Sequence, residues 1–196
     1  DGKLVVHHDP VVAGLGQIVT LDRSALPDWL PDLDEALDAC APMGVTVEVK
    51  DLPGEEAFDP QHRTMTMVGE VVAQRLATGA NDGQALQVSC FFHPALEALA
   101  ARHPAVPRAY LSDRGWDHFR VASAAAAAGA VSLHPYQAEV TEALVTHAHD
   151  LGLRVEPWTV NDPARLAAMV AWGADRVMTD DIAAALAAGC RRFEPS

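Results

Sequence analysis

The chain has 196 residues, of which 49% are apolar, and it carries a formal net charge of −13. This length can bury a sizeable core, and it predicts a single domain over residues 1–196. The acidic charge argues against nucleic acid or an anionic membrane surface as a partner. With no run of eighteen apolar residues, no transmembrane helix is expected. We therefore expect a small-molecule ligand, and an anionic ligand would need a metal ion or a local cationic group.

The cysteines do not point to a metal or redox site. Cys40, Cys90 and Cys190 are odd in number, widely spaced and outside any C-x-x-C pattern, so reduced thiols are expected. We expect a cytoplasmic protein, with a secreted or periplasmic location left open because the chain begins at Asp1 and not at Met. The sequence gives no indication of the oligomeric state.

The first predicted element is a short alternating strand over Lys3–His8, which follows an Asp-Gly turn and suggests a hairpin. Its partner would lie upstream of Asp1. His8 shares the apolar face of this strand with Leu4 and Val6, and Asp9 and Pro10 end the strand directly afterwards. His8 is therefore either a packed structural residue or a general acid or base at a strand end.

The next strand, Val45–Lys50, follows a helix that Asp32 and Glu35 begin as a capping box. The strand is apolar on both faces until it ends in Glu48 and Lys50, which share one face. This ending indicates either a site at the carboxyl end of a covered parallel strand or a surface ion pair on an edge strand.

Helices and strands alternate along the rest of the chain, as they do in βα units with a parallel sheet. Each of three helices is expected to begin at an X-Pro pair: Asp59-Pro60, His93-Pro94 and Asp162-Pro163, the last ending at Gly173. The predicted parallel strands are Val45–Lys50, Leu86–Cys90, Arg108–Leu111, Ala130–His134, Leu153–Thr159 and Arg176–Thr179.

These six βα units predict an α/β fold of the (β/α)8 TIM-barrel class, in which the first two strands are missing from the chain as given. A complete barrel has eight units and about 250 residues. The chain would then be a single partial barrel domain over 1–196 that begins with a hairpin strand. The alternative is an open parallel sheet of six strands.

Polar residues at the carboxyl ends of the predicted strands are the candidates for a barrel site. Besides Glu48 and Lys50, they are Ser89, His134, Trp158, Asn161, Thr179 and Asp180, with Phe91 beside Ser89. We favour structural roles for Ser89, for His134, which precedes a proline, and for Asp180 as a helix N-cap. Trp158 either packs at the barrel mouth or contacts a ligand.

Six motifs occur in an order that resembles the glycerophosphodiester phosphodiesterase family. They are Asp1-Gly2-x-Leu4-Val5-Val6-x-His8-Asp9, Leu33-Asp34-Glu35-Ala36-Leu37, Val47-Glu48-Val49-Lys50, Val88-Ser89-x-Phe91, Trp158-Thr159-Val160-Asn161 and Gly173-Ala174-Asp175-Arg176-Val177-Met178-Thr179-Asp180. The resemblance spans nearly the whole chain and implies a (β/α)8 barrel.

The resemblance also implies a function: hydrolysis of a small-molecule glycerophosphodiester to glycerol 3-phosphate and an alcohol, with two histidines and a divalent cation, Mg²⁺ or Ca²⁺. By this resemblance His8 matches the second histidine, the general acid for the leaving alcohol. Glu48 matches the third metal-binding carboxylate and Lys50 a lysine that meets the phosphate. Trp158 matches an aromatic residue that packs against the glycerol or the leaving group.

The chain departs from the family pattern in ways that bear on activity. The family's first histidine, in a His-Arg-Gly, and its Glu-x-Asp metal ligands would fall before Asp1, so the chain as given is expected to be inactive and Glu48 to hold a metal only weakly. The segment Val11–Val19 also lacks the family's Thr-Leu-x-Arg-Thr-Thr stretch. Two alternatives remain: a degenerate, non-catalytic barrel that binds a phosphorylated ligand, and a related phosphodiesterase for phospholipid head groups.

Overall fold

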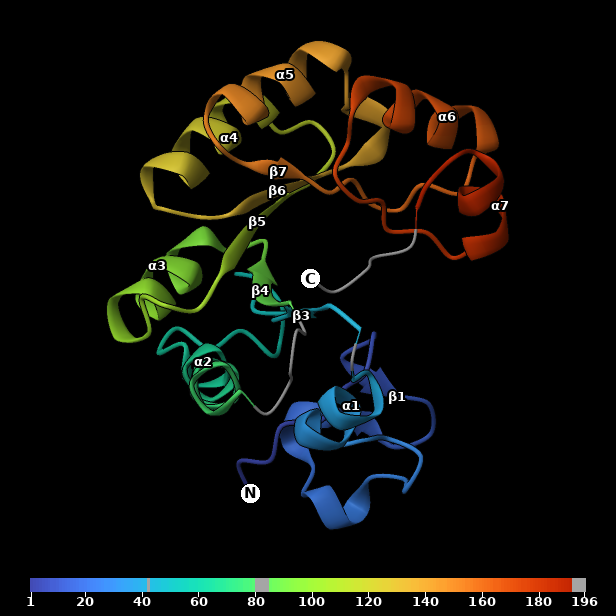
Figure 1. Cartoon of the computed structure of the whole chain (residues 1–196). Coiled ribbons are helices and arrows are strands. Elements are labelled where there is room, and N and C mark those ends of the chain that lie inside the picture. The colour runs from blue at the N-terminus through green and yellow to red at the C-terminus, as the bar shows by residue number, and fades with distance from the viewer. Residues whose placement is uncertain (42, 80–84, 192–196) are drawn as a thin grey trace.

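A parallel β-sheet forms the centre of the molecule. The computed structural model describes residues 1–41, 43–79 and 85–191. Five strands lie side by side in chain order, and Figure 1 shows them as a curved sheet. They are β3 (Val45–Glu48), β4 (Leu86–Cys90), β5 (Arg108–Ser112), β6 (Ser132–Pro135) and β7 (Arg154–Val155). All four neighbouring pairs are parallel, so the carboxyl ends of the strands meet at one edge.

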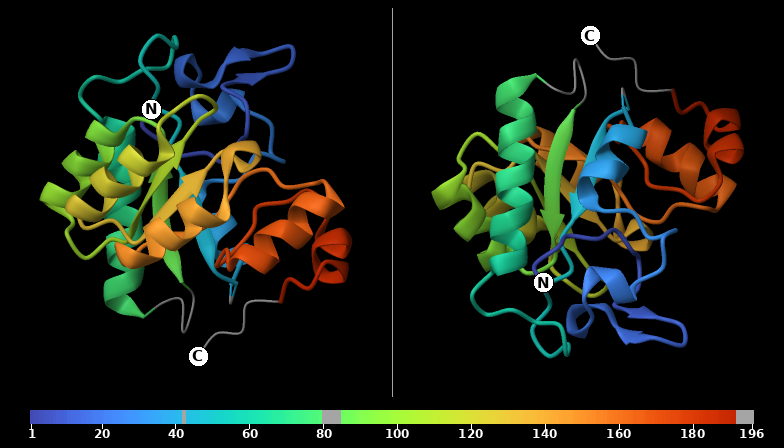
Figure 2. Two further views of the ribbon diagram at one scale, coloured as in Figure 1. Left: turned by 90° about the horizontal axis from the view of Figure 1, so that it is seen from above. Right: turned by 90° about the horizontal axis from the view of Figure 1, so that it is seen from below.

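Helices connect the strands and cover the outer side of the sheet, and Figure 2 shows α2 running alongside β4. They are α2 (Arg63–Thr78), α3 (His93–Arg102), α4 (His118–Ala127), α5 (Glu142–Asp150), α6 (Pro163–Trp172) and α7 (Ile182–Ala187). This alternation buries β4 and β5 along their whole length. Among the described residues, no helix has both the length and the apolar character needed to cross a bilayer.

The first forty residues form a smaller unit, drawn in blue in Figure 1. It contains the hairpin β1 (Val11–Val12) and β2 (Gly16–Gln17), the 3-10 turns η1 (Ile18–Thr20) and η2 (Arg23–Ala25), and helix α1 (Leu33–Ala39). Val12, Leu26 and Leu30 form a small apolar cluster of their own. Arg75 of α2 ties α1 to the barrel helices, because its guanidinium lies 2.7 Å from the carboxylates of both Asp34 and Asp38.

Most of the predicted elements form where the sequence places them. Leu86–Cys90 is a strand with the expected bounds. The capping box of Asp32 and Glu35 begins α1, and Asp162 caps α6 through the backbone N–H of Arg165 before Gly173 ends that helix with a φ of 83°. The α/β fold class with a parallel, barrel-type sheet is confirmed.

The predicted strand at Lys3–His8 is wrong. In this segment only Val5 makes a bridge, with Asp32, and Val6 is 43% exposed. The first hairpin lies later, at β1 and β2, where Gly14 and Gly16 adopt positive φ values of 81° and 100°. His8 is consequently not held on an apolar strand face.

The helix expected to begin at Asp59-Pro60 begins four residues later, at Arg63. The Asp59 carboxylate accepts the backbone N–H groups of Gln61 and Arg63, at 3.1 and 2.6 Å, and so closes a separate turn. His62 then enters the helix in the left-handed conformation, with a φ of 52°. Pro60 therefore lies within this separate turn and does not occupy the first turn of the helix.

The predicted strand at Arg176–Thr179 does not form a regular strand, although it lies beside the chain that follows β7. Met178 donates its N–H to Pro157 O at 2.9 Å and accepts from Val160 N at 2.8 Å. A regular parallel ladder would also need residue 157 to donate to residue 176, and proline has no N–H. Pro157 therefore interrupts the ladder, and β7 is named only over Arg154–Val155.

Candidate active site

Glu48 and Lys50 lie together at the carboxyl end of β3. The Lys50 ammonium is 3.1 Å from Glu48 Oε1, and both side chains are about one third exposed, at 36% and 35%. Glu48 pairs in register with Ser89 of β4, so Lys50 and Phe91 each follow two residues later on neighbouring segments. The prediction that the two charges share one face is met, and the sheet edge presents both of them to solvent.

A buried carboxylate directly follows this pair. Asp51 is 2% exposed; its Oδ1 accepts the backbone N–H of Asp59 at 2.9 Å, and its Oδ2 lies 3.2 Å from His62 Nδ1. These contacts hold the chain between β3 and α2 against the sheet edge. The sequence does not predict the contact between Asp51 and His62. Its only signal is an acidic residue directly after an apolar strand.

Cys90 ends β4 beneath the same edge. Its thiol is fully buried and accepts the backbone N–H of Phe92 at 3.3 Å. Burial, reinforced by the negative charges of Asp51 and Glu48, raises the pKa of the Cys90 thiol to about 11. The thiol is therefore protonated at neutral pH and does not act as a nucleophile or metal ligand.

His8 lies on an exposed turn near this edge. Its side chain is 87% exposed, and Nδ1 is 2.8 Å from Asp9 Oδ1. The hydrogen bond from His8 lowers the pKa of the Asp9 carboxyl, with smaller electrostatic contributions from His7 and from Lys50. The influence of Lys50 on Asp9 places the His8-Asp9 turn within electrostatic range of the β3 end. The turn holds His8 by the Asp9 carboxylate, where the sequence had indicated an apolar strand face.

Trp158 stands at the same edge, beyond β7. Its indole N–H donates to the backbone oxygen of His134 at 2.9 Å, and it forms a parallel bridge with Tyr136. The edge of its ring meets Phe91 at a centroid distance of 5.4 Å and Tyr136 at 5.5 Å. The tryptophan therefore belongs to a row of aromatic rings in contact, whose members Phe91, Tyr136 and Trp158 each follow a different strand of the sheet.

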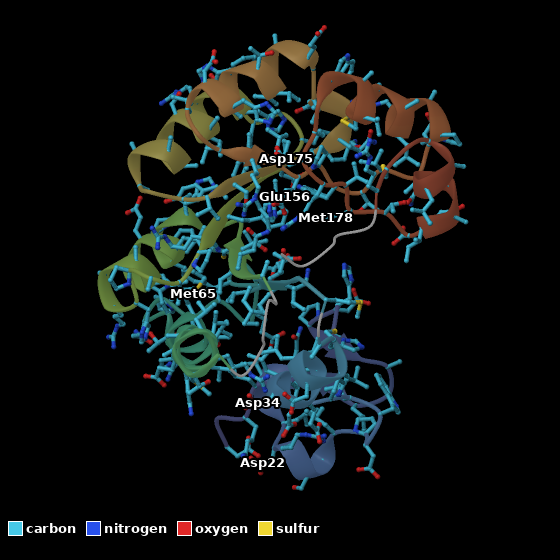
Figure 3. All side chains as sticks on the ribbon, in the orientation of Figure 1. Asp22, Asp34, Met65, Glu156, Asp175 and Met178 are labelled. Carbon is cyan, nitrogen blue, oxygen red and sulfur yellow. The ribbon has the colours of Figure 1, made fainter. Side chains whose placement is uncertain are left out.

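A buried polar network lies inside the sheet below these rings. Glu156 is 2% exposed and lies toward the middle of the molecule (Figure 3). Its carboxylate is 3.1 Å from His134 Nε2, 3.2 Å from Arg154 and 3.4 Å from Arg176. Burial would raise the Glu156 pKa, but His134, Arg176 and the side-chain amide of Gln87 outweigh it and lower the pKa to about 2. Sequence reasoning did not find Glu156, which sits between Val155 and Pro157 without any motif.

The sequence predicts structural roles for both His134 and Asp180, and the structure places His134 in the buried network but does not make Asp180 a helix cap. The ring of His134 is fully buried in the network around Glu156. Asp180, expected as an N-cap, instead accepts the side-chain amide of Asn161 at 2.8 Å. The next residue, Asp181, caps α7 by accepting the backbone N–H of Ala184 at 2.9 Å.

The described residues do not by themselves form a metal centre. Nowhere in this part of the chain do three or more His, Cys, Asp or Glu side chains gather as a ligand set. Glu48 has one oxygen paired with Lys50, whereas Mg²⁺ and Ca²⁺ require at least six oxygen ligands. Glu48 can supply one ligand but not a site.

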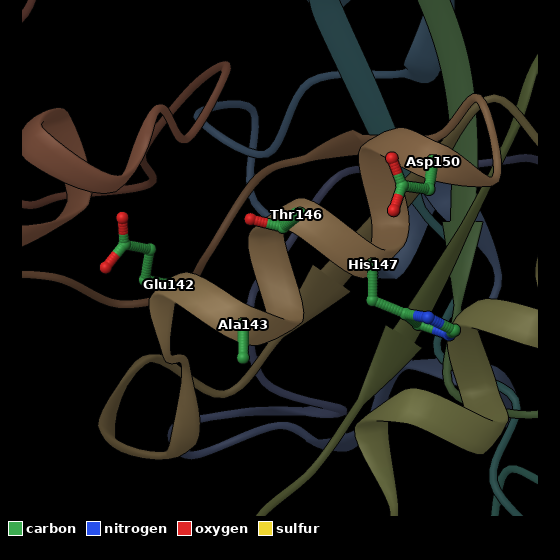
Figure 4. Close-up of a pocket in the computed structure, with 5 residues that line it drawn as sticks. All are labelled: Glu142, Ala143, Thr146, His147 and Asp150. Carbon is green, nitrogen blue, oxygen red and sulfur yellow. The ribbon is translucent and has the colours of Figure 1, made fainter.

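A surface hollow of about 470 Å³ lies elsewhere, along the outer side of α5 (Figure 4). It is lined by Glu142, Ala143, Thr146, His147 and Asp150. These residues belong to the helix layer and not to the carboxyl edge of the sheet. The hollow therefore does not contribute to the candidate active site.

Comparison with known proteins identifies relatives of this chain. The model of the glycerophosphoryl diester phosphodiesterase family matches residues 1–184. No protein with a curated description matches the chain.

Several solved structures share its fold. A protein of Silicibacter pomeroyi assigned as a glycerophosphoryl diester phosphodiesterase is 24% identical with a TM-score of 0.78, over 96% of this chain and 79% of that one. A phosphodiesterase of Oleispira antarctica, in complex with the product sn-glycerol-3-phosphate, is 21% identical with a TM-score of 0.78, over 96% and 80%. A glycerophosphodiester phosphodiesterase of Thermotoga maritima is 21% identical with a TM-score of 0.71, over 96% and 80%.

Proposed function

Because the chain belongs to the glycerophosphoryl diester phosphodiesterase family, whose members are phosphoric diester hydrolases, we propose that it takes part in hydrolysing a glycerophosphodiester to glycerol 3-phosphate and an alcohol. The observation that carries this proposal is the pairing of Glu48 and Lys50 at the carboxyl end of β3. The carboxyl ends of parallel barrel strands are where such enzymes bind substrate.

In this proposal Lys50, His8 and Trp158 each have a separate role in the reaction. Lys50 is the cation that meets the phosphodiester, and it offsets the repulsion expected from an acidic protein. His8 is the general acid, and the Asp9 carboxylate 2.8 Å from its Nδ1 orients the ring for this role. Trp158 supplies an apolar surface for the glycerol or the leaving alcohol.

The reaction proceeds in two displacements at phosphorus. The neighbouring glycerol hydroxyl attacks phosphorus while a general base takes its proton, a part that the resemblance gives to the histidine of the family's His-Arg-Gly. The bond to the leaving alcohol breaks, and His8 gives its proton to the departing oxygen. The product is a cyclic phosphate. Water then attacks phosphorus, and the bond to the oxygen that attacked in the first step breaks. That oxygen takes up a proton in place of the one lost from water, which yields glycerol 3-phosphate.

We also propose that the reaction uses a divalent cation, Mg²⁺ or Ca²⁺, and that Glu48 is one of its ligands. A hard cation with carboxylate ligands would offset phosphate charge. The described residues do not complete such a site, so further carboxylates, like the Glu-x-Asp pair of the family, are required. Lys50 must also leave Glu48 Oε1 before that oxygen can bind an ion.

The test is turnover of glycerophosphocholine by the full-length protein with added Mg²⁺ or Ca²⁺. We expect release of glycerol 3-phosphate, and a loss of at least about a hundredfold in His8→Ala or Glu48→Gln. His7→Ala is the matched control, because His7 is the adjacent histidine and bonds to a backbone oxygen. Equal activity in His7→Ala and His8→Ala would contradict the role of His8.

One observation favours a second function. Since no three metal-ligating side chains gather in the described part of the chain, the barrel is also suited to holding a phosphorylated ligand through Lys50 and Trp158 without turnover. Calorimetry with glycerol 3-phosphate separates the two functions. Binding without hydrolysis by the full-length protein would support the second.

A further inference from the structure

We propose that Arg114 selects the leaving alcohol, so that the substrate is a glycerophosphodiester of an oxygen-rich alcohol, a polyol or an anionic alcohol, and not of choline. This inference rests on the proposed function and names its substrate class. The structural feature that carries it is the loop between β5 and α4, which places a cation at the end of the aromatic row around Trp158.

The aromatic row is continuous across the sheet edge. Trp116 meets Phe91 at a centroid distance of 6.4 Å, Phe91 meets Trp158 at 5.4 Å, and Trp158 meets Tyr136 at 5.5 Å. All three contacts are edge-to-face, the geometry that aromatic pairs favour. Trp116 remains 40% exposed, so the row presents ring surface to solvent.

Arg114 closes the row at the Tyr136 end. Its guanidinium carbon lies 4.9 Å from the centre of the Tyr136 ring, and Nη2 donates to the Tyr136 hydroxyl at 2.6 Å. That hydrogen bond raises the pKa of Arg114 further above its ordinary value, so the charge is permanent. Among the described residues the other guanidinium N–H groups have no hydrogen-bond acceptor, and the side chain is exposed.

Hydrogen bonds hold the loop that carries Arg114 and Trp116 in place at the carboxyl edge of the sheet. Glu139, which follows β6, accepts the backbone N–H of Gly115 at 3.0 and 2.9 Å and lies 2.8 Å from His118 Nε2. His118 Nδ1 is in turn 2.8 Å from the hydroxyl of the buried Ser112. This chain of contacts holds one loop across three strands, with Trp116 toward β4 and Arg114 toward β6.

The chemistry of these groups decides which alcohol suits the row. Aromatic faces alone attract a quaternary ammonium group such as choline. Arg114 already lies over the Tyr136 ring, so that ring face is not open to a choline ammonium group. Its free donors instead suit hydroxyl, carboxylate or phosphate oxygens, which guanidinium binds with directed hydrogen bonds. The rings then pack against the carbon skeleton of the alcohol.

Binding measured through the intrinsic tryptophan fluorescence of the full-length protein tests the inference independently of turnover. The two probes are glycerophosphoinositol, whose alcohol is an uncharged polyol, and glycerophosphocholine, whose alcohol carries a quaternary ammonium group. We expect the inositol ester to bind at least about tenfold more tightly than the choline ester. In Arg114→Gln that preference should fall about tenfold, while the affinity for the choline ester stays equal or improves.

Arg102→Gln is the matched control, because Arg102 is an exposed arginine in the last turn of α3, away from the carboxyl edge. This variant should keep the wild-type preference. Equal affinities for the two esters, an Arg114→Gln variant with an unchanged preference, or binding of neither ester would each overturn the inference. Selective binding without hydrolysis would uphold the inference and contradict only the proposed reaction.

Discussion

The indole N–H of Trp158 donates to the backbone carbonyl oxygen of His134, at 2.9 Å. This bond joins the two layers of the candidate site, since Trp158 belongs to the aromatic row and the His134 ring to the buried network around Glu156. The position of the tryptophan therefore depends on the strand that carries His134, and not only on its neighbouring rings.

The first prediction separates this hydrogen bond from the packing of the ring. Trp158→Phe keeps an aromatic ring but loses the donor, and we expect it to lower the free energy of unfolding by about 1 kcal/mol. Trp158→Ala also removes the ring contacts with Phe91 and Tyr136, and should cost about 3 kcal/mol. Urea unfolding followed by circular dichroism measures both. Equal losses in the two variants would show that the hydrogen bond dominates.

The second prediction concerns acid stability. The pKa of Glu156 is about 2 in the folded protein, below its ordinary value of 4.5, so the unfolded chain binds a proton more readily. The stability that Glu156 contributes is therefore complete above about pH 4.5 and is lost as the pH falls toward 2. Thermal unfolding between pH 6 and pH 3 should show this loss in the wild-type protein.

The variant Glu156→Gln tests the same residue at neutral pH. It leaves Arg154, Arg176 and His134 around a neutral side chain, and we expect a loss of about 3 kcal/mol, as when a buried pair loses one partner. The stability of this variant should also fall less than that of the wild type between pH 6 and pH 3. Glu70→Gln, at an exposed position of α2, is the control and should change neither property.

The third prediction tests the turn between β3 and α2. Asp51→Ala leaves the buried N–H of Asp59 without its acceptor and removes the contact with His62, so we expect a loss of about 2 kcal/mol. Asp51→Asn keeps an acceptor oxygen and should recover about half of that loss. Chemical denaturation compares the two. An alanine variant as stable as the wild type would show that this turn is not held by Asp51.

The fourth prediction concerns the cation of the proposed site. The chain has two lysines, Lys3 and Lys50. Lys50→Met should lower kcat/KM for a glycerophosphodiester about a hundredfold in the full-length protein, because the phosphate loses its cation. Lys3→Met removes the same charge from an exposed position and should leave kcat/KM unchanged. Similar losses in both variants would indicate a general effect of net charge.

The sequence predicts the elements whose signals are local. Asp162-Pro163 and Gly173 delimit α6 because a side-chain cap, a fixed proline φ and a left-handed glycine each act within one turn. Leu86–Cys90 is predicted as a parallel strand because it is a short segment between two helical segments, the alternation typical of βα units. Glu48 and Lys50 share a face because the strand period is two.

Features that depend on distant partners could not be predicted in this way. The ladder beside Met178 fails because of Pro157, about twenty residues earlier in the chain. Likewise, nothing near Glu156 in the sequence shows that His134 and Arg176, each about twenty residues away along the chain, converge on it. Alternation after an Asp-Gly turn predicts a strand through His8, whereas the isolated bridge at Val5 does not extend the pairing to it.

Because Cys90 is buried at the end of β4, the rate at which its thiol is alkylated can report how often this end of the sheet opens. The thiol is enclosed beneath Glu48 and Asp51, and it stays protonated because its pKa is about 11. An alkylating reagent can reach it only when the end of β4 opens, so its modification rate counts these openings. Cys40 and Cys190 are partly exposed and would react first, which leaves Cys90 as the slow thiol. A ligand that binds at the sheet edge would slow that last reaction further, without any need for turnover.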